Sequence, residues 1–392
     1  MNIIIKSIGE LKMLKDNYQM CTKCVMDTTD PEIYFDDDGV CDHCHDFVSN
    51  VLPNWHPNEE GQKQLNRIFN KVKKKSLGKD YDCIMGMSGG LDSSYLLHQV
   101  VSVHGLRPLV FHVDAGWNSD IAVSNIQNIV DKLGLDLFVE VIDWDDMKDF
   151  QLALFKSGIP SLDIAQDHAF FAVMYHFALK HNIKYIINGG NHSTECCRNP
   201  LEWLYYGTDM RFVKDIRNKF CSRPLKNYPW SGIFYHKFYL KFLRGINVVK
   251  PLDLMEYNKK IAIDTLEDEY GWQAYPQKHF ESRFTKFFEG YWLPSRFGYD
   301  MRKPQFSSLI STNQMSRAEA LENLKASPFD VNTIEADFEF IANKLEISVD
   351  ELKQLHELPL KSYKNYKNSL FIMNMGAKIM QFLGFEKQAI KR

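Results

Sequence analysis

The sequence predicts an α/β fold in which a parallel sheet is covered by helices on both faces. Between residues 81 and 255, short apolar runs alternate with longer amphipathic segments, at the spacing of strand–helix units. Short continuous apolar runs are typical of strands that are buried on both faces. Four runs are therefore expected to be strands: YDCIMGM (81–87), RPLVFHV (107–113), DLFVEVI (136–142) and KYIING (184–189).

Helices are expected between these strands, joined to them by right-handed crossovers. The three intervening segments, 94–105, 121–134 and 167–182, have the length and amphipathic pattern of helices. A last strand–helix unit is expected from VVKPLDLM (248–255) and a helix over Tyr257–Tyr270. A polar helix over Glu59–Lys75 is expected before the sheet.

A chain of 392 residues is longer than one ordinary core requires, and its composition changes along its length. We expect a cysteine-rich metal-binding segment over 1–60, the sheet domain over 61–271 and a helical region over 272–392 that completes the substrate site. In the last region Ser316 is followed three residues later by Glu319, which is a helix-capping arrangement.

The overall composition is that of a soluble globular protein, with 45% hydrophobic and 25% charged residues. The net charge of −3 provides no overall positive field, so a nucleic-acid partner is disfavoured. No apolar run is long enough to span a bilayer, and the opening MNIIIKSIGELKML has no signal-peptide cleavage site. A cytoplasmic protein is expected.

A serine- and glycine-rich loop directly follows the first expected strand and opens a helix. Two glycines allow a tight turn whose N–H groups can approach an anion, and the helix N-terminus and the hydroxyls favour the same ligand. No lysine follows, so the loop is not of the kind that transfers a γ-phosphoryl group. Asp92 within it is expected to cap the helix or to hold Mg²⁺. The loop consists of Ser88, Gly89, Gly90, Leu91, Asp92, Ser93 and Ser94.

This string resembles the PP-loop of GMP synthetase, NAD synthetase, asparagine synthetase and tRNA-thiolating enzymes. The resemblance implies that ATP is cleaved to AMP and pyrophosphate, and that the loop holds the pyrophosphate. It also places adenine and ribose at the end of the second strand, at His112, Val113 and Asp114.

The fourth expected strand ends in another glycine turn at the same edge of the sheet, where ligands of parallel sheets bind. Its candidate ligand-binding residues are Gly189, Gly190 and Asn191, although a simple strand-to-loop turn has the same pattern. Glu195 follows, as a carboxylate that holds Mg²⁺ or steers a nucleophile, or as an exposed loop residue.

Four of the eight cysteines form two CxxC pairs near the N-terminus. Cys21 and Cys24 are followed, after sixteen residues, by Cys41 and Cys44, and this spacing is typical of a zinc ribbon. Four thiolates close the coordination shell, which indicates a structural Zn²⁺; an iron–sulfur or redox site is the alternative.

A narrower resemblance covers most of residues 20–325. Taken together, the motifs resemble the N-acetyl sugar amidotransferase family of PP-loop enzymes, which serves lipopolysaccharide, surface polysaccharide or flagellar glycan biosynthesis in bacteria. The motifs are CTKCVMDTTDP (21–31), SGGLDSSY (88–95), HVDAGWNS (112–119), GGNHSTE (189–195), KHFESRFTKFF (278–288), FGYDMRKPQFSSLI (297–310) and SRAEAL (316–321).

The family implies that ATP adenylates the oxygen of a sugar acetamido group and that ammonia then replaces it, which gives an acetamidino group. Ammonia would come from a separate glutaminase with a cyclase-like companion, because no glutaminase triad region is visible in this sequence. The substrate would be a nucleotide-linked or free acetamido sugar, and the cofactors would be Mg²⁺ and structural Zn²⁺. Whether the chain forms a homodimer stays open.

Two charged motifs are candidate parts of the substrate site. Lys278, Glu281 and Arg283 are expected to bind phosphate, sugar or Mg²⁺, and Arg302 is expected to act in the same way; solvated helix surface is the alternative for each. We expect Lys278→Ala to lose turnover and to keep its fold.

Two other functions share some of these features. A tRNA thiolase would also join zinc knuckles to a PP-loop, and Cys196 and Cys197 would then carry sulfur. A basic tRNA-binding domain is missing, however. A non-enzymatic adaptor with a degenerate nucleotide fold is disfavoured because residues 88–94 keep every donor of the loop.

Overall fold

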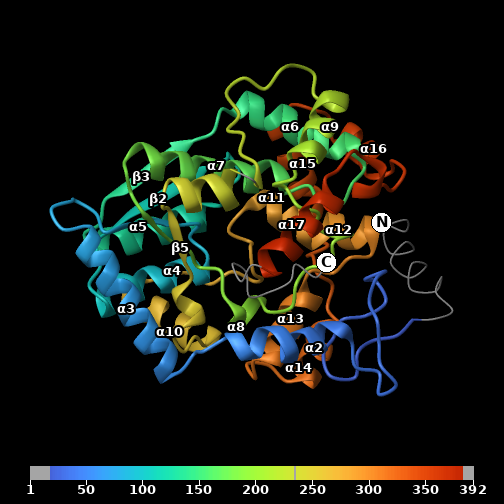
Figure 1. The fold of residues 1–392 in the computed structure, drawn as a ribbon. Coiled ribbons are helices and arrows are strands. Elements are labelled where there is room, and N and C mark those ends of the chain that lie inside the picture. Colours follow the sequence, from blue (N-terminus) through green and yellow to red (C-terminus); the bar gives the residue numbers. More distant parts are fainter. Residues whose placement is uncertain (1–17, 234, 383–392) are drawn as a thin grey trace.

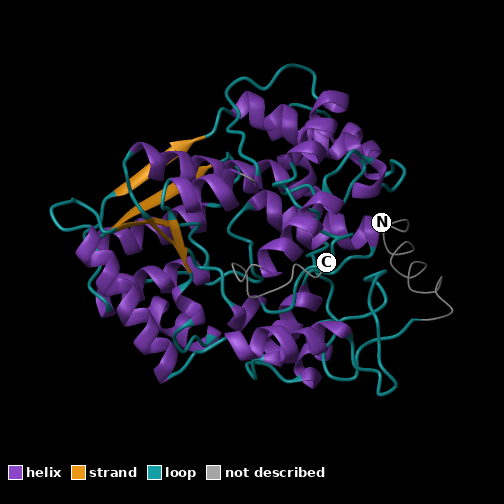
Figure 2. Ribbon diagram, in the orientation of Figure 1, coloured by secondary structure: helices purple, strands orange, loops and turns teal. Residues whose placement is uncertain are grey.

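A computed structural model describes residues 18–233 and 235–382; the opening segment considered above as a signal peptide lies outside them. Within these residues the sheet has five strands, all parallel, in the order β3-β2-β1-β4-β5. The strands form one side of the molecule in Figure 2. The expected parallel α/β sheet is confirmed. The strands are β1 (Cys83–Gly86), β2 (Pro108–Asp114), β3 (Leu137–Val141), β4 (Tyr185–Ile187) and β5 (Asn247–Val249).

Helices cover both faces of the sheet, as the buried residues of the strands show. In β1, Cys83 and Met85 join one hydrophobic cluster and Ile84 joins another, because successive side chains of a strand point to opposite faces. The first cluster includes residues of α3 (Glu59–Lys75), α4 (Leu91–His98), α5 (Asp120–Leu133) and α10 (Lys259–Tyr270), and the second includes residues of α7 (Ile164–Lys180).

Several helix boundaries follow from capping. Helix α3 has the expected bounds, because Asn58 accepts hydrogen bonds from the backbone N–H groups of Glu60 and Gly61. The helix expected from Tyr257 begins two residues later, since Asn258 caps it. Helix α4 continues as a π-helix over Gln99–Val103, within the helix expected at 94–105.

The expectation that every strand is buried on both faces is wrong for β3. It lies at the edge of the sheet, with β2 as its neighbour, and Val139 and Val141 are 45% and 69% exposed. Apolar composition alone does not distinguish an edge strand from a central one, because the difference depends on how many neighbours pair with it.

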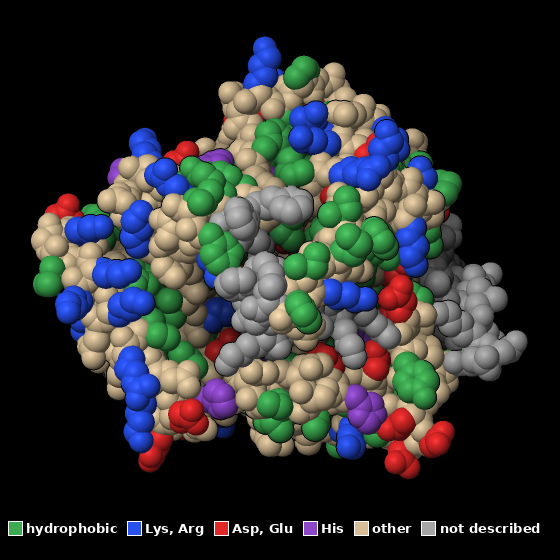
Figure 3. All heavy atoms as spheres, in the orientation of Figure 1, with side chains coloured by type: hydrophobic (Ala, Val, Ile, Leu, Met, Phe, Trp, Pro, Cys, Tyr) green, Lys and Arg blue, Asp and Glu red, His purple; other side chains and the backbone are tan. Residues whose placement is uncertain are grey.

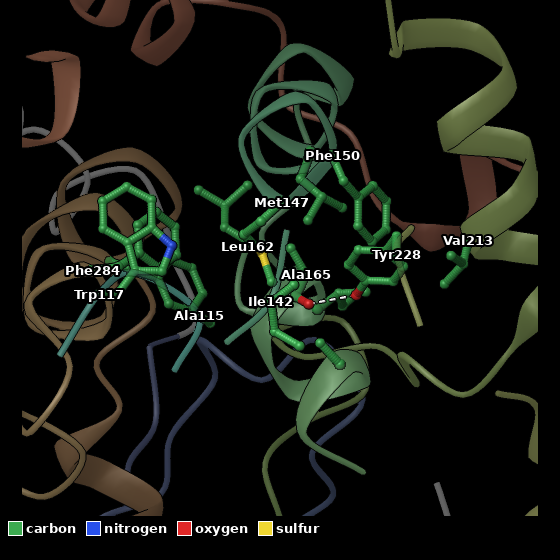
Figure 4. Packing of buried hydrophobic residues seen from close by; sticks show 14 of the residues in the cluster. Ala115, Trp117, Ile142, Met147, Phe150, Leu162, Ala165, Val213, Tyr228 and Phe284 are labelled. Atoms are coloured by element: carbon green, nitrogen blue, oxygen red, sulfur yellow. Dashed lines mark hydrogen bonds between the residues drawn. The ribbon is translucent and has the colours of Figure 1, made fainter. Parts of the chain in front are cut away.

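Beyond residue 272 the described chain forms helices, as expected (Figure 1). These helices share a hydrophobic core with the sheet, because Trp117, which follows β2, packs against Phe284 (Figure 4). In the same cluster Phe150 packs against Tyr228. The remaining α-helices are α2 (Asp42–Asp46), α6 (Trp144–Ser157), α8 (His192–Glu195), α9 (Met210–Phe220), α11 (Arg283–Phe287), α12 (Leu293–Phe297), α13 (Arg302–Ser311), α14 (Arg317–Asn323), α15 (Ile334–Leu345), α16 (Val349–His356) and α17 (Leu370–Phe382).

Short turns of other helix types connect these elements. The π-helical segments besides the one after α4 are Phe47–Val51, Tyr235–Leu243 and Phe288–Trp292, and the 3₁₀ segments are Leu52–Asn54, Pro251–Asp253 and Tyr363–Asn365. Among the helices described, none is both long and apolar enough to cross a bilayer. On the face drawn in Figure 3, Lys and Arg side chains are interspersed with acidic and hydrophobic ones.

Candidate functional site

A cavity of about 620 Å³ lies at the carboxyl ends of the strands. Strand β1 lies in the middle of the sheet. The strands that follow it in sequence, β2 and β3, lie on one side of β1, and β4 and β5 lie on the other side. Ligands of open parallel sheets bind at such a switch point. The cavity is accordingly lined by the loops after β1 and β4, and also by residues 274–289, which precede and begin the C-terminal helices.

The loop after β1 is held in shape by its glycines and by its own hydroxyls. Gly89 has a φ of +81°, and its carbonyl oxygen accepts hydrogen bonds from Trp272 Nε1 and Tyr275 Oη, each at 3.1 Å. Ser93 Oγ lies 3.2 Å from Ser88 Oγ and donates to the carbonyl oxygen of Gly90 at 3.1 Å. These contacts preform an anion-binding loop at the N-terminus of α4.

Replacing Gly89 with alanine should abolish nucleotide binding and destabilise the protein. A Cβ there would lie 2.7 Å from the carbonyl oxygen of Ala122, in addition to the unfavourable φ, and the combined cost is about 3 kcal/mol. Gly134→Ala is the matched control, because its φ is also positive, +61°, but its Cβ would meet open space. It should cost only about 1 kcal/mol in chemical denaturation and leave ATP binding unchanged. Equal behaviour of the two variants would contradict this account.

Lys278 connects the two loops electrostatically. Its Nζ lies 2.7 Å from Asp92 Oδ2, 2.8 Å from Glu195 Oε1 and 3.0 Å from Thr194 Oγ1. Tyr257 Oη donates a further hydrogen bond to Asp92. One ammonium group therefore joins the helix after β1 to the turn after β4.

The pKa values around Lys278 follow from these pairings. Burial disfavours the charged lysine, but the Asp92 and Glu195 carboxylates outweigh it and raise the pKa of Lys278. Burial likewise opposes ionisation of Glu195, and Lys278 reverses the effect and lowers the pKa of Glu195. The pair is thus charged at neutral pH, inside a cavity wall where an unpaired charge would be costly.

Glu281 lies against the phosphate loop. Its Oε1 accepts a hydrogen bond from Ser88 Oγ at 3.1 Å, and it would be 2.6 Å from a Cβ placed on Gly90. Backbone hydrogen bonds fix this segment: Ser119 N donates to the Glu281 carbonyl oxygen at 2.9 Å, and Arg283 N donates to that of Trp117 at 2.8 Å. A carboxylate beside an anion-binding loop has the chemistry of a ligand for a divalent cation that accompanies phosphate.

A second cluster of ionisable side chains lines the same cavity. Burial, followed by the charge of Asp167, raises the pKa of Asp163 well above its ordinary value. Desolvation by the cavity walls raises the pKa of Asp167 to about 6, although its side chain is accessible from the cavity. His279 lies 3.2 Å from Glu289, whose carboxylate overcomes the effect of burial and raises the pKa of His279 to about 10. Carboxyl groups of this kind can exchange a proton near neutral pH.

Most of the residues predicted from the sequence line the cavity. They are Ser88, Gly90, Leu91, Asp92, Ser93, His112, Val113, Gly189, Gly190, Glu195, Lys278 and Glu281. Gly89 and Ser94 belong to the loop without forming part of the lining, and Ser94 is fully buried.

Asp114 and Asn191 support the walls instead of lining them. Asp114 Oδ1 accepts hydrogen bonds from Gly116 N at 2.7 Å and Asn118 Nδ2 at 3.1 Å. Asn118 also contacts His112 Nε2 at 2.9 Å. The Asn191 side chain caps α8 by accepting from Thr194 N at 2.9 Å.

The structure does not bring Arg283 or Arg302 to the cavity. The guanidinium of Arg283 stacks on the ring of Phe340, 3.4 Å from its centroid. Arg302 is 6% exposed and is paired with Asp300 at 2.7 Å. It also donates to two carbonyl oxygens, one at the last residue of α14 and one shortly after this helix. Both side chains therefore hold C-terminal helices in place, and neither is retained as a candidate for substrate contact.

Sequence reasoning missed several residues of the lining. Asp163, Gln166 and Asp167 lie around the start of α7, and Lys259 begins α10. Glu289 follows the charged motif that was recognised. None of these residues belongs to a spaced motif, so no local pattern in the sequence indicated them.

The four cysteines of the two CxxC pairs lie together, and their sulfur atoms are all within 4.8 Å of one another. Cys24 and Cys41 are separated by 3.5 Å between their Sγ atoms, and Cys21 and Cys44 by 3.8 Å. A tetrahedral ion with metal–sulfur bonds of about 2.3 Å separates its ligands by about 3.8 Å. The cluster could therefore hold one metal ion, and backbone N–H groups already approach its sulfur atoms.

The metal-binding segment is attached to helices α13 and α14. Arg317 Nη2 donates to the Cys21 carbonyl oxygen at 2.8 Å, and Lys303 pairs with the buried Asp27. Cys197 packs against the cysteine cluster, only two residues beyond Glu195 of the cavity. Helix α8, which ends at Glu195, also packs on α13 (Figure 1). The cysteine cluster thus supports one wall of the cavity.

The parallel sheet with a serine- and glycine-lined loop between β1 and α4 defines the PP-loop fold. Residues 281–380 match the model of a family described as "LPS biosynthesis protein WbpG-like, C-terminal domain". The expected relation to a lipopolysaccharide biosynthesis family is confirmed for this part of the chain. No curated protein matches the sequence.

Three solved structures have some similarity to the chain at low identity. A U34-tRNA thiolase, NcsA, from Methanococcus maripaludis with its [4Fe-4S] cluster is 13% identical; the match covers 88% of this chain and 90% of that one, with a TM-score of 0.32. An NH3-dependent NAD synthetase from Campylobacter jejuni, in complex with the nitrate ion, is 13% identical over 55% and 98%, with a TM-score of 0.27. A predicted subunit of tRNA methyltransferase from Methanocaldococcus jannaschii is 14% identical over 47% and 74%, with a TM-score of 0.28.

Proposed function

We propose that the protein is an ATP-dependent amidotransferase that converts an acetamido group of a sugar to an acetamidino group in lipopolysaccharide or related glycan biosynthesis. One observation carries the proposal: the phosphate loop and the family-matched segment line the same cavity. Ser88 and Ser93 come from the loop, and Glu281, Glu289 and Gln305 from the segment over 281–380. A nucleotide on the loop would therefore meet a substrate held by that segment.

In the proposed reaction the amide oxygen attacks the α-phosphorus of ATP, and the bond to the bridging oxygen breaks to release pyrophosphate. Ammonia then adds to the imidate carbon, a proton is lost, and AMP leaves with the former amide oxygen. The donors of residues 88–94 would stabilise the departing pyrophosphate. Residues His112–Asp114 would hold adenine and ribose, as the resemblance implies.

Two metal ions have fitting side chains. Mg²⁺ would be held by Glu281, whose hard oxygen ligands suit it and which lies beside Ser88 of the loop, and the ion would neutralise phosphate charge. Structural Zn²⁺ would be held by the four clustered thiolates. Ammonia would be supplied by a separate glutaminase with a cyclase-like companion.

Sulfur transfer to RNA, the alternative function, requires a reactive thiol near the nucleotide. Within the described residues no cysteine lines the cavity. Burial raises the pKa of Cys196 to about 11 and that of Cys197 well above its ordinary value, so both thiols stay protonated. These observations favour the amidotransferase.

The test is to incubate the protein with ATP, Mg²⁺ and ammonium over a panel of free and nucleotide-linked acetamido sugars. We expect release of AMP and pyrophosphate that depends on one sugar, and mass spectrometry should show that this sugar has exchanged an oxygen for NH. Glutamine without ammonium should support no turnover. Turnover only with bulk tRNA and a sulfur donor would overturn the proposal in favour of the thiolase.

A further inference from the structure

A second lysine lines the cavity near Lys278, and its charge is not balanced. Lys259 is the first residue of α10, and its backbone N–H donates to Gln314 Oε1 at 2.8 Å. Across the described parts of the chain, its ammonium group forms no hydrogen bond and no ion pair. Lys278, in contrast, already binds Asp92 and Glu195.

The surroundings of Lys259 favour an anion. Burial lowers its pKa, the nearby charge of Lys278 lowers it further, and Asp92 opposes both effects. A cation in such a place is electrostatically unfavourable until a counter-ion arrives. The carboxylate of Asp92, whose charge acts on Lys259, is already bound by Lys278 and Tyr257, so a ligand is the source of a balancing charge.

We propose that Lys259 binds the terminal phosphates of ATP and holds the pyrophosphate as it leaves. The ligand class is a polyphosphate anion, because the cavity that Lys259 lines also contains Ser88, Gly90 and Ser93 of the phosphate loop. This assignment rests on the proposed use of ATP, and it moves the phosphate-neutralising role from Lys278 to Lys259. Lys278 instead fixes the two loops against each other.

The test compares Lys259→Gln with Lys260→Gln in the full-length protein. Lys260 is the next residue of the same helix, and its side chain is exposed, which makes it a matched control for the loss of one positive charge. Calorimetry with ATP, inorganic pyrophosphate and AMP measures binding. Lys259→Gln should weaken ATP and pyrophosphate binding about tenfold to a hundredfold and leave AMP binding unchanged, because a charge-assisted hydrogen bond is lost. Lys260→Gln should change each affinity less than about twofold.

Each outcome separates this inference from the proposed function. If the wild type binds ATP and Lys259→Gln binds ATP and pyrophosphate equally well, the inference is wrong and the proposed function stands. An equal loss of AMP affinity would also overturn it, since the lysine would then contact the nucleoside monophosphate. A wild-type protein that does not bind ATP would overturn both. Lys259→Met guards against a folding defect: pyrophosphate should raise the melting temperature of the wild type and not that of the variant.

Discussion

Replacing Cys41 with serine should abolish metal binding by the cysteine cluster, where we propose a Zn²⁺ ion, and produce the largest loss of stability of any single substitution considered for this protein. Cys41 is fully buried and its sulfur lies 3.5 Å from that of Cys24. Without it, only three thiolates remain to coordinate the ion, and the tetrahedral site is incomplete. Structural Zn²⁺ contributes about 10–16 kcal/mol to the folding of small zinc-binding domains, and much of that would be lost here. Metal analysis of the purified protein and thermal unfolding with and without a chelator measure the two effects.

The control for this substitution is Cys221→Ser. Cys221 lies outside the cluster, and its Sγ makes only a long contact of 3.9 Å with the carbonyl oxygen of Asp149. This variant should keep a full complement of zinc and unfold close to the wild-type temperature. Iron in place of zinc in the wild type would contradict the assignment of the ion, and unchanged metal content in Cys41→Ser would contradict the site itself.

The Lys278→Ala variant should lose turnover by at least about a hundredfold and also lose stability. The sequence alone suggested an effect on turnover with an intact fold. The structure changes the second part, because removal of the ammonium takes away the cation that both Asp92 and Glu195 contact, and only uncharged hydrogen-bond donors remain beside them. Asp92 and Lys278 are 18% and 19% exposed but Glu195 is 40% exposed, so solvent screens part of the effect and the loss should be about 2 kcal/mol. Steady-state kinetics and denaturant unfolding test the two parts separately.

Lys286→Ala is the matched control. Its Nζ lies 3.0 Å from Asp337 Oδ2, but the side chain is 38% exposed, so its loss should cost less than about 1 kcal/mol. If Lys278→Ala is as stable as this control, the electrostatic link between the two loops is not important for folding. If its turnover is also unchanged, Lys278 does not belong to the site.

The substitutions at Lys278 and Cys41 affect the same short segment, residues 195–197, from its two sides. Helix α8 ends at Glu195, which faces Lys278 in the cavity, while Cys197 contacts the cysteine cluster. Loss of metal is therefore expected to disturb the cavity through this short segment as well as through the general loss of stability.

The sequence by itself determined the features that depend on local order. Alternating apolar and amphipathic segments predicted the parallel sheet. The spacing of apolar residues differs between strands and helices, and this spacing can be recognised within about twenty residues of sequence. The order of residues 88–94, directly after β1, placed an anion-binding loop at a helix N-terminus. The two CxxC pairs placed four sulfur atoms together, since each knuckle orients two ligands locally.

Only the tertiary structure decided which distant residues meet. Lys278 reaches Asp92 across 186 positions in the chain because the strand-like contact between Asn118 and Ser282 fixes its segment over the loop. The same packing turns Arg302 toward Asp300 and, among the residues that the structure describes, leaves the Lys259 ammonium without an ion-pair partner. Charged residues have no periodic pattern that records their partners, so their pairing depends on the complete fold, and the same is true of the edge position of β3.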